Sequence, residues 1–304
     1  MNHDFVSNII AAPFTPMNEM GAIKPSSIPD YAKKLKKDGL AGVFICGTTG
    51  EGMSLTVAER KIVAEEWIKF QDTDFKVIVH VGTTSVKQSQ ELGQHAQKIG
   101  AYATSTMGPL FLKPNSVNLL VDFCAEIAAA APNIPFFYYH IPLISGIELS
   151  MVDYIDAAKS KIPNFSGVKY THDNFEEMKK LKEKDGGKWE IFNGFDEHLI
   201  DAFSVGVNNA VGSTYNYIYP MFKSMINEYG AGNIDEAREH QIKNNEIISA
   251  LFDFGGPQIA GKAIMKMLGV DCGPCRLPLS NLSEDSISNL SKKLKEIGFF
   301  ELNS

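Results

Sequence analysis

Residues 42–52 read GVFICGTTGEG, and this stretch begins the unit that decides the fold of the chain. Its apolar first half is typical of a strand buried on both faces, as in a parallel sheet. The glycines of its second half indicate a turn, after which Thr56 and Glu59 form a capping-box pattern that begins a helix. Another apolar run follows at 76–81, so the stretch predicts a strand–turn–helix unit of an α/β fold.

The same alternation of short apolar runs and longer segments of helical period recurs along the chain. Strands are predicted at 7–12, 42–46, 76–81, 101–106, 135–140, 167–170, 190–193 and 209–212. Helices are predicted between them at 27–38, 56–70, 85–99, 116–130, 150–159, 175–184 and 198–205, and after them at 220–230, 233–252, 258–268 and 284–297. The pattern predicts a (β/α)8 TIM barrel over 1–219 and a C-terminal helical extension over 220–304, packed together as one structural unit.

The composition of the chain limits the kinds of partner it is expected to bind and the compartment in which it is expected to lie. The 304 residues carry a formal net charge of −7, so the chain has no general attraction for nucleic acid or for an anionic membrane. No apolar run approaches the ~20 residues that span a bilayer, and no targeting segment is visible at the start. Four cysteines do not make a disulfide scaffold, so a cytoplasmic location is expected.

The Cys-Gly-Pro-Cys sequence at 272–275 has the form of a redox motif. Such a motif should follow a strand and begin a helix, where the helix N-terminus lowers the pKa of a thiol. Here Arg276-Leu277-Pro278 follows, which favours a loop over a redox site.

Lys169 is the most informative of the polar residues near predicted strand ends. In a barrel of this kind the active site forms where strands end and the following loops begin. A lysine inside a short apolar strand is unusual, because a lysine is rarely buried without a partner. A protonated amine cannot attack a carbonyl, whereas burial disfavours the ammonium and frees the lone pair. The alternative is a lysine whose charged end reaches solvent at the strand end.

Other strand ends carry weaker signals. Thr48 and Thr49, with neighbouring glycines, could hold a carboxylate or phosphate, or could form only a tight turn. Tyr139 could transfer a proton or pack in the core, whereas His140 is expected to be structural, since no second ligand stands at metal-binding spacing. Acidic residues after the seventh strand could bind sugar hydroxyls or complement a helix N-terminus.

Together these motifs resemble the N-acetylneuraminate lyase and dihydrodipicolinate synthase family of class I aldolases, in order from about 9 to 279. The resemblance implies that Thr48 and Thr49 bind a carboxylate. It also implies that Lys169 forms a Schiff base and that Tyr139 transfers protons. Within the family the chain is similar to the animal-type branch of sialic acid lyases, through YHIP at 139–142, GFDE at 194–197 and GSTYN at 212–216.

That branch implies a small-molecule substrate, N-acetylneuraminate, cleaved to pyruvate and N-acetylmannosamine with no metal and no organic cofactor. The resemblance assigns the polyhydroxylated part of the sugar to Thr171, Gly194, Asp196, Glu197 and Ser213. It also implies a homotetramer. Many bacterial members carry a tyrosine after the fourth strand that reaches into a neighbouring subunit's proton relay, and Phe111 stands in its place here.

Three alternatives stay open. Another pyruvate-dependent aldolase, acting on a 2-keto-3-deoxy sugar acid, would share Lys169, Tyr139 and the threonine turn. A dihydrodipicolinate synthase is disfavoured, because its usual arginine after the tyrosine motif is replaced by Leu143-Ile144-Ser145 and the chain's three arginines are far away in sequence. A non-catalytic regulator that binds a sugar acid is less favoured still, because a binder needs no Schiff-base lysine.

Overall fold

Eight parallel strands close into a barrel in the computed structural model, which describes residues 8–302. Each strand pairs with its neighbours in chain order, and β1 pairs with β8 to close the sheet. The strands are β1 (Asn8–Ala11), β2 (Gly42–Ile45), β3 (Lys76–His80), β4 (Ala103–Met107), β5 (Phe136–His140), β6 (Phe165–Tyr170), β7 (Glu190–Asn193) and β8 (Asn209–Gly212). All eight predicted strands are therefore confirmed to within a few residues, although the predicted start at Ser7 lies outside the described residues.

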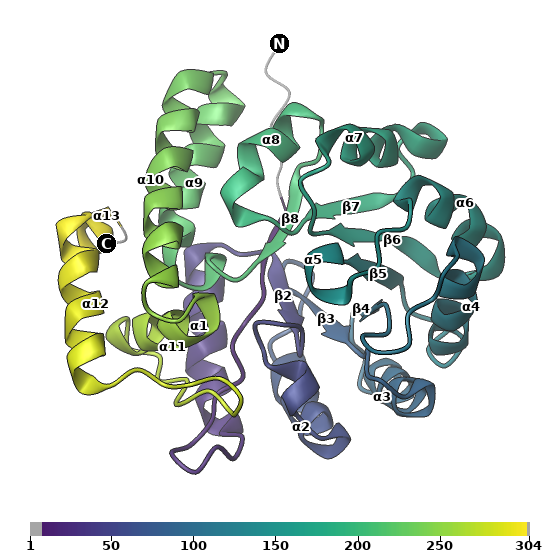
Figure 1. The fold of residues 1–304 in the computed structure, drawn as a ribbon, viewed down its shortest axis with the longest axis horizontal. Helices are drawn as coiled ribbons and strands as arrows, with labels where there is room; N and C mark the ends of the chain where they lie inside the picture. Colours follow the sequence, from purple (N-terminus) through teal and green to yellow (C-terminus); the bar gives the residue numbers. More distant parts are fainter. Residues whose placement is uncertain (1–7, 303–304) are drawn as a thin grey trace.

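Helices surround the barrel, as Figure 1 shows. They are α1 (Ile28–Asp38), α2 (Val57–Ile68), α3 (Val86–Lys98), α4 (Val117–Ala128), α5 (Pro142–Ser145), α6 (Met151–Lys161), α7 (Phe175–Glu183), α8 (Leu199–Ser204), α9 (Tyr215–Ala231), α10 (Ile234–Phe252), α11 (Pro257–Met267), α12 (Glu284–Glu296) and α13 (Phe299–Leu302). The capping box of Thr56 and Glu59 is present at α2. The four-residue helices α5 and α13 were not predicted, since one helical turn has no readable period.

Side chains alternate between two cores along the strands. Phe44 of β2 points into the barrel, whereas its neighbours Val43 and Ile45 pack against the surrounding helices. On β5, Tyr139 points inward and Tyr138 outward by the same alternation. Burial on both faces explains why the strands read as continuous apolar runs.

The helix after β8 begins earlier than predicted. Its start was predicted at Pro220, but α9 begins at Tyr215 and includes the proline. Pro220 has no N–H to donate to the carbonyl of Asn216, and that carbonyl instead accepts a 3.0 Å hydrogen bond from Lys34 Nζ. Ile218 departs from helical geometry, so the helix kinks where the proline interrupts it.

The last helices lie together on one side of the barrel, where α9, α10 and α11 contact one another (Figure 1). The cysteines of the Cys-Gly-Pro-Cys sequence lie in the loop between α11 and α12, as the sequence indicated. Burial raises the pKa of Cys272 to about 12 and that of Cys275 to about 11, so both remain thiols at neutral pH. Within residues 8–302, no helix is long and apolar enough to cross a membrane.

Candidate active site

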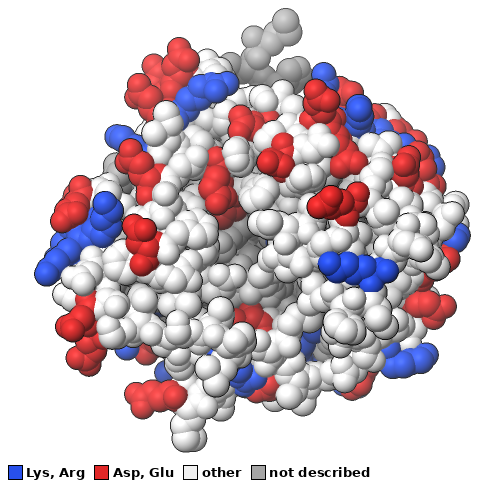
Figure 2. Space-filling model, in the orientation of Figure 1, with Lys and Arg blue, Asp and Glu red and all other residues white. Residues whose placement is uncertain are grey.

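Lys169 lies at the carboxyl end of β6 with its side chain inside the barrel, and it is 6% exposed. Its Nζ is 3.8 Å from the centre of the Tyr139 ring and 4.8 Å from the centre of the Phe44 ring. Tyr139 is its direct neighbour in the pairing of β5 with β6. Figure 2 shows a depression near the middle of this view, surrounded mainly by uncharged residues. The geometry brings the two residues predicted to be catalytic into contact.

The wall beside Tyr139 contains two rings that sequence reasoning missed. Phe44 and His80 both meet the Tyr139 ring edge to face, with centroids 5.6 Å and 6.1 Å away. Burial lowers the pKa of His80 well below its usual value, and the nearby charges of Arg60 and Lys169 lower it further. His80 is therefore neutral, and its Nε2 lies 3.3 Å from the donating amide of Met107. A neutral ring packed in this way limits the positions that Tyr139 can take.

The turn after β2 has an unusual backbone. Cys46 and Glu51, which flank the predicted carboxylate-binding threonines, have φ values of 58° and 53° in the left-handed region. Non-glycine residues in this region are uncommon, and they concentrate where surrounding contacts impose the conformation. Among residues 8–302, no hydrogen bond is found from the backbone amides of Thr48 and Thr49. These amides remain available to an anionic ligand.

Asp196 is the second titratable centre at this end of the barrel. It is 4% exposed, and its Oδ2 accepts hydrogen bonds from the amide of Thr214 at 2.9 Å and from its hydroxyl at 2.6 Å. Burial, and then the charge of Glu197, raise the pKa of Asp196 to about 6, although Thr214 and Lys169 oppose the rise. Its Oδ1 is buried beside Gly212, and the Tyr215 hydroxyl, whose pKa is raised by burial, lies close enough for Asp196 to raise the pKa of Tyr215 further.

Close packing gathers the other predicted sugar-binding residues near Asp196. A β-carbon at Gly212 would lie 1.6 Å from Asp196 Oδ1, and one at Gly194 would lie 1.8 Å from Thr171 Oγ1. Only glycine fits either position, which explains the glycines in both motifs. Ser213 directly follows Gly212 and is half-buried, as is Glu197 beside Asp196. The ends of β6, β7 and β8 thus bring a hydroxyl, a buried carboxylate and a half-buried carboxylate together.

His140 lies on the opposite face of β5 from Tyr139. Its ring stacks on Tyr170, with centroids 5.1 Å apart. Burial, and then the charge of His172, lower the pKa of His140 to about 3, so it is neutral. In the part of the chain that the structure describes, no group of three or more His, Cys, Asp or Glu side chains is arranged to hold a metal.

Thr214 and Arg60 are the other site residues that the sequence did not reveal. Thr214 binds Asp196 through both its amide and its hydroxyl, and a hydroxyl residue after a strand was the only available signal. Arg60 is buried in α2, where its guanidinium donates to the carbonyls of His80 and Gly82. An arginine in the helical pattern of α2 reads as an exposed residue, so its burial has no sequence signal.

Comparisons with known proteins agree with this arrangement. A family model described as the dihydrodipicolinate synthetase family matches residues 5–297. N-acetylneuraminate lyase from Homo sapiens is 38% identical over 97% of this chain and 93% of its own length. N-acetylneuraminate lyase A from Xenopus laevis is 40% identical over 96% of this chain and 97% of its own. The solved structure of Proteus mirabilis N-acetylneuraminate lyase superposes with a TM-score of 0.93 at 36% identity, covering 97% of this chain and all of that chain.

Proposed function

Because the chain belongs to the dihydrodipicolinate synthetase family, we propose that it is an N-acetylneuraminate lyase that works through a Schiff base on Lys169. The observation that carries the proposed site is the buried amine of Lys169 against the ring of Tyr139. A reactive amine and a phenol in contact at the carboxyl end of a barrel suit carbon–carbon cleavage next to a carbonyl.

Binding of the open-chain sugar acid begins the proposed reaction. The amides and hydroxyls of Thr48 and Thr49 hold the carboxylate, and this anchors the neighbouring C2 ketone at Lys169. Thr171, Asp196 and Glu197 receive the hydroxyl-bearing part of the sugar, because they lie at the ends of the next strands around the barrel. Ser213 and the backbone at Gly194 complete this surface.

Lys169 then converts the ketone into an electron sink. Its neutral amine adds to C2, and loss of water leaves a cationic iminium. The Tyr139 hydroxyl gives its proton to the departing water and becomes a phenolate. As general base, this phenolate takes the proton of the C4 hydroxyl. The C3–C4 bond breaks, and its electrons form the C2–C3 double bond of an enamine while the iminium nitrogen becomes neutral. N-acetylmannosamine leaves as the aldehyde. Protonation of C3 and hydrolysis of the iminium then release pyruvate and restore Lys169.

The positions of the three arginine side chains favour this reaction over dihydrodipicolinate synthesis. Arg60 is buried against backbone carbonyls, Arg276 is paired with Glu59, and Arg238 is exposed on α10. None is placed after β5, where a synthase would grip a second carboxylate. A lyase for a 2-keto-3-deoxy sugar acid remains the second candidate, since it would use the same lysine, tyrosine and threonines.

Two measurements test the proposal. The purified protein should release pyruvate from N-acetylneuraminate, and it should release less from a 2-keto-3-deoxy sugar acid at the same concentration. Borohydride with pyruvate should add a reduced pyruvyl group to the peptide that contains Lys169, as read by mass spectrometry. Release from the deoxy sugar acid alone would favour the second candidate, and labelling of another lysine would refute the assignment of Lys169.

Assembly as a cytoplasmic homotetramer is also part of the proposal. Exposed apolar side chains follow β4 and β5 at the active-site end of the barrel. Phe111 is 87% exposed, Leu112 80% and Leu143 86%. Exposed apolar side chains of this size support a surface that another subunit covers. Replacing Phe111 and Leu143 with serine should lower the molecular mass measured by light scattering, and an unchanged mass would contradict this interface.

A further inference from the structure

The turn that carries Thr48 and Thr49 ends at Glu51, which is bonded both within the turn and to a distant part of the chain. Glu51 combines a left-handed φ of 53° with a buried carboxylate. Its amide donates to the carbonyl of Thr48 at 3.1 Å, so the position of Glu51 is tied directly to the threonine. A buried carboxylate also needs a partner, because burial without one is strongly unfavourable. The group that pairs with Glu51 can therefore determine the shape of the turn.

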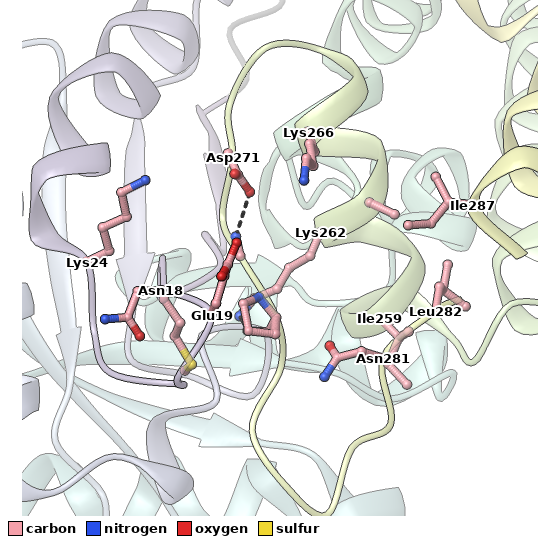
Figure 3. A pocket seen from close by; sticks show the side chains of 14 residues that line it. Asn18, Glu19, Lys24, Ile259, Lys262, Lys266, Asp271, Asn281, Leu282 and Ile287 are labelled. Carbon is pink, nitrogen blue, oxygen red and sulfur yellow. Dashed lines mark hydrogen bonds between the residues drawn. The ribbon is translucent and has the colours of Figure 1, made fainter. Parts of the chain in front are cut away.

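Lys262 of α11 is that partner. Its Nζ lies 2.7 Å from Glu51 Oε1, and the side chains of both residues are 3% exposed. The same Nζ donates to the carbonyl of Pro274 at 2.7 Å. Figure 3 shows the Lys262 side chain running from α11 along a cavity of about 340 Å³, whereas Lys266 borders the same cavity from the next turn of the helix. The catalytic end of the barrel is thus bonded to a helix beyond the eighth strand.

Arg276 binds the other carboxylate oxygen of Glu51. Its amide donates to Glu51 Oε2 at 2.8 Å. Its guanidinium pairs with Glu59, the residue that closes the capping box at the start of α2. It also donates to the carbonyl of Ser54 at 2.9 Å, within the segment that joins the turn to α2. Glu51 and the start of α2 are consequently held by one short segment of the C-terminal region.

We infer that Lys262 is a positioning residue for the lyase reaction: its ion pair with Glu51 holds Thr48 and Thr49 in the shape that binds the substrate carboxylate. The inference rests on the proposed function, because it concerns the same site. Lys262 touches neither the substrate nor the reacting atoms in this scheme. Its loss should weaken binding of every 2-keto acid, including pyruvate, while Lys169 and Tyr139 remain in place.

Borohydride trapping at a series of pyruvate concentrations tests the inference. Lys262→Met removes the charge and keeps most of the stem, and Lys266→Met is the matched control on the same helix and cavity. The half-saturating pyruvate concentration should rise roughly tenfold in Lys262→Met. It should change less than about twofold in Lys266→Met, and Lys262→Arg should recover part of the loss. With N-acetylneuraminate, KM should rise more than kcat falls.

A purely structural role predicts a different result. It would lower the thermal midpoint of Lys262→Met and leave the half-saturating pyruvate concentration of the folded protein unchanged, which would overturn the inference. If Lys262→Met does not fold, the double variant Glu51→Gln/Lys262→Met leaves no unpaired buried charge and should show the same weakened pyruvate binding. Normal binding in that variant would also overturn it. Failure of the unmodified protein to trap pyruvate would instead refute the proposed function.

Discussion

The two ends of the barrel hold similar side chains in different surroundings. At the amino end, Lys76 Nζ lies 4.5 Å from the centre of the Tyr102 ring, and Glu190 lines the same cavity of about 200 Å³. At the carboxyl end, Lys169 meets Tyr139, and Asp196 lies close enough for the charge of Lys169 to affect its pKa. Each end therefore offers a lysine, a tyrosine and a carboxylate.

The surroundings separate the two sets. Lys76 and Tyr102 are half-buried, and the turn residues that line the cavity beside them, Thr73 and Asp74, are exposed. Lys169 and Tyr139 are buried beside aromatic rings, at the end of the barrel where the loops after β2, β6, β7 and β8 begin. A lysine over a tyrosine ring is thus insufficient for a site. In barrel enzymes the loops at the carboxyl ends of the strands supply the groups that bind a substrate.

The largest expected contrast is between the two lysines. Lys169→Ala should reduce cleavage of N-acetylneuraminate below detection and abolish trapping by borohydride, because the proposed Schiff base forms on the Lys169 amine. Lys76→Ala should keep near-normal activity and lose only some stability. Pyruvate release and mass spectrometry give both readings. If borohydride still trapped pyruvate on Lys169→Ala, the Schiff base would form on another lysine, and the proposed difference between the two ends would be wrong.

The tyrosines should differ by less. Tyr139→Phe should lower kcat by roughly 10²–10⁴-fold if the hydroxyl carries the proton, since the ring and its packing are retained. Tyr102→Phe is the matched control and should change kcat less than about twofold. Steady-state kinetics on the two variants decide the point. A near-normal rate for Tyr139→Phe would make Tyr139 a packing residue like its counterpart.

The carboxylates of the two ends, Asp196 and Glu190, should differ in their effect on pH-dependent stability and on substrate binding. The folded-state pKa of Asp196 is raised to about 6 from a usual value of 3.8, so the folded protein binds this proton more tightly than the unfolded chain. The stabilisation from this proton is complete below about pH 4 and is lost as pH rises through about 6. The free energy of unfolding should therefore fall by about 3 kcal/mol over this range. In Asp196→Asn the free energy of unfolding should no longer fall in this way, because asparagine does not titrate.

Urea unfolding between pH 4 and pH 8 measures this effect. Glu190, whose pKa is raised by burial and lowered by Lys76, should contribute in the same direction, and Glu190→Gln is the control. Only Asp196→Asn should also raise KM for N-acetylneuraminate. Identical pH profiles for Asp196→Asn and the unmodified protein would contradict the raised pKa, and an equal rise in KM for Glu190→Gln would contradict the proposed assignment of the ends.

Local pattern was sufficient to predict most of the fold. The strand and helix periods located every barrel strand and the longer helices, because burial on one or both faces leaves a repeating apolar signal. The start of α9 was wrong, because Pro220 reads as a helix start when the replacement partner of the Asn216 carbonyl, Lys34, is 182 residues away. A helix interior can accommodate a proline only when another part of the chain supplies the missing donor.

The residues of the candidate site likewise divide into those with a local sequence signal and those without one. Lys169 was visible because a charge in an apolar strand contradicts its surroundings, and Tyr139 because it ends a strand. The neutral His80, the two bonds from Thr214 and the buried Arg60 were not visible, because each depends on a contact with a different segment. No local pattern marks such contacts.

The sequence by itself determined the barrel, the end at which chemistry is expected and the candidate lysine, since these follow from the apolar periodicity and from the residue that breaks it. Only the tertiary structure decided how that end is held together. The ion pair of Lys262 with Glu51 and the bond from the Arg276 amide join segments more than 200 residues apart. Their strength comes from shared burial, which exists only after the strands have closed and α11 has packed beside them.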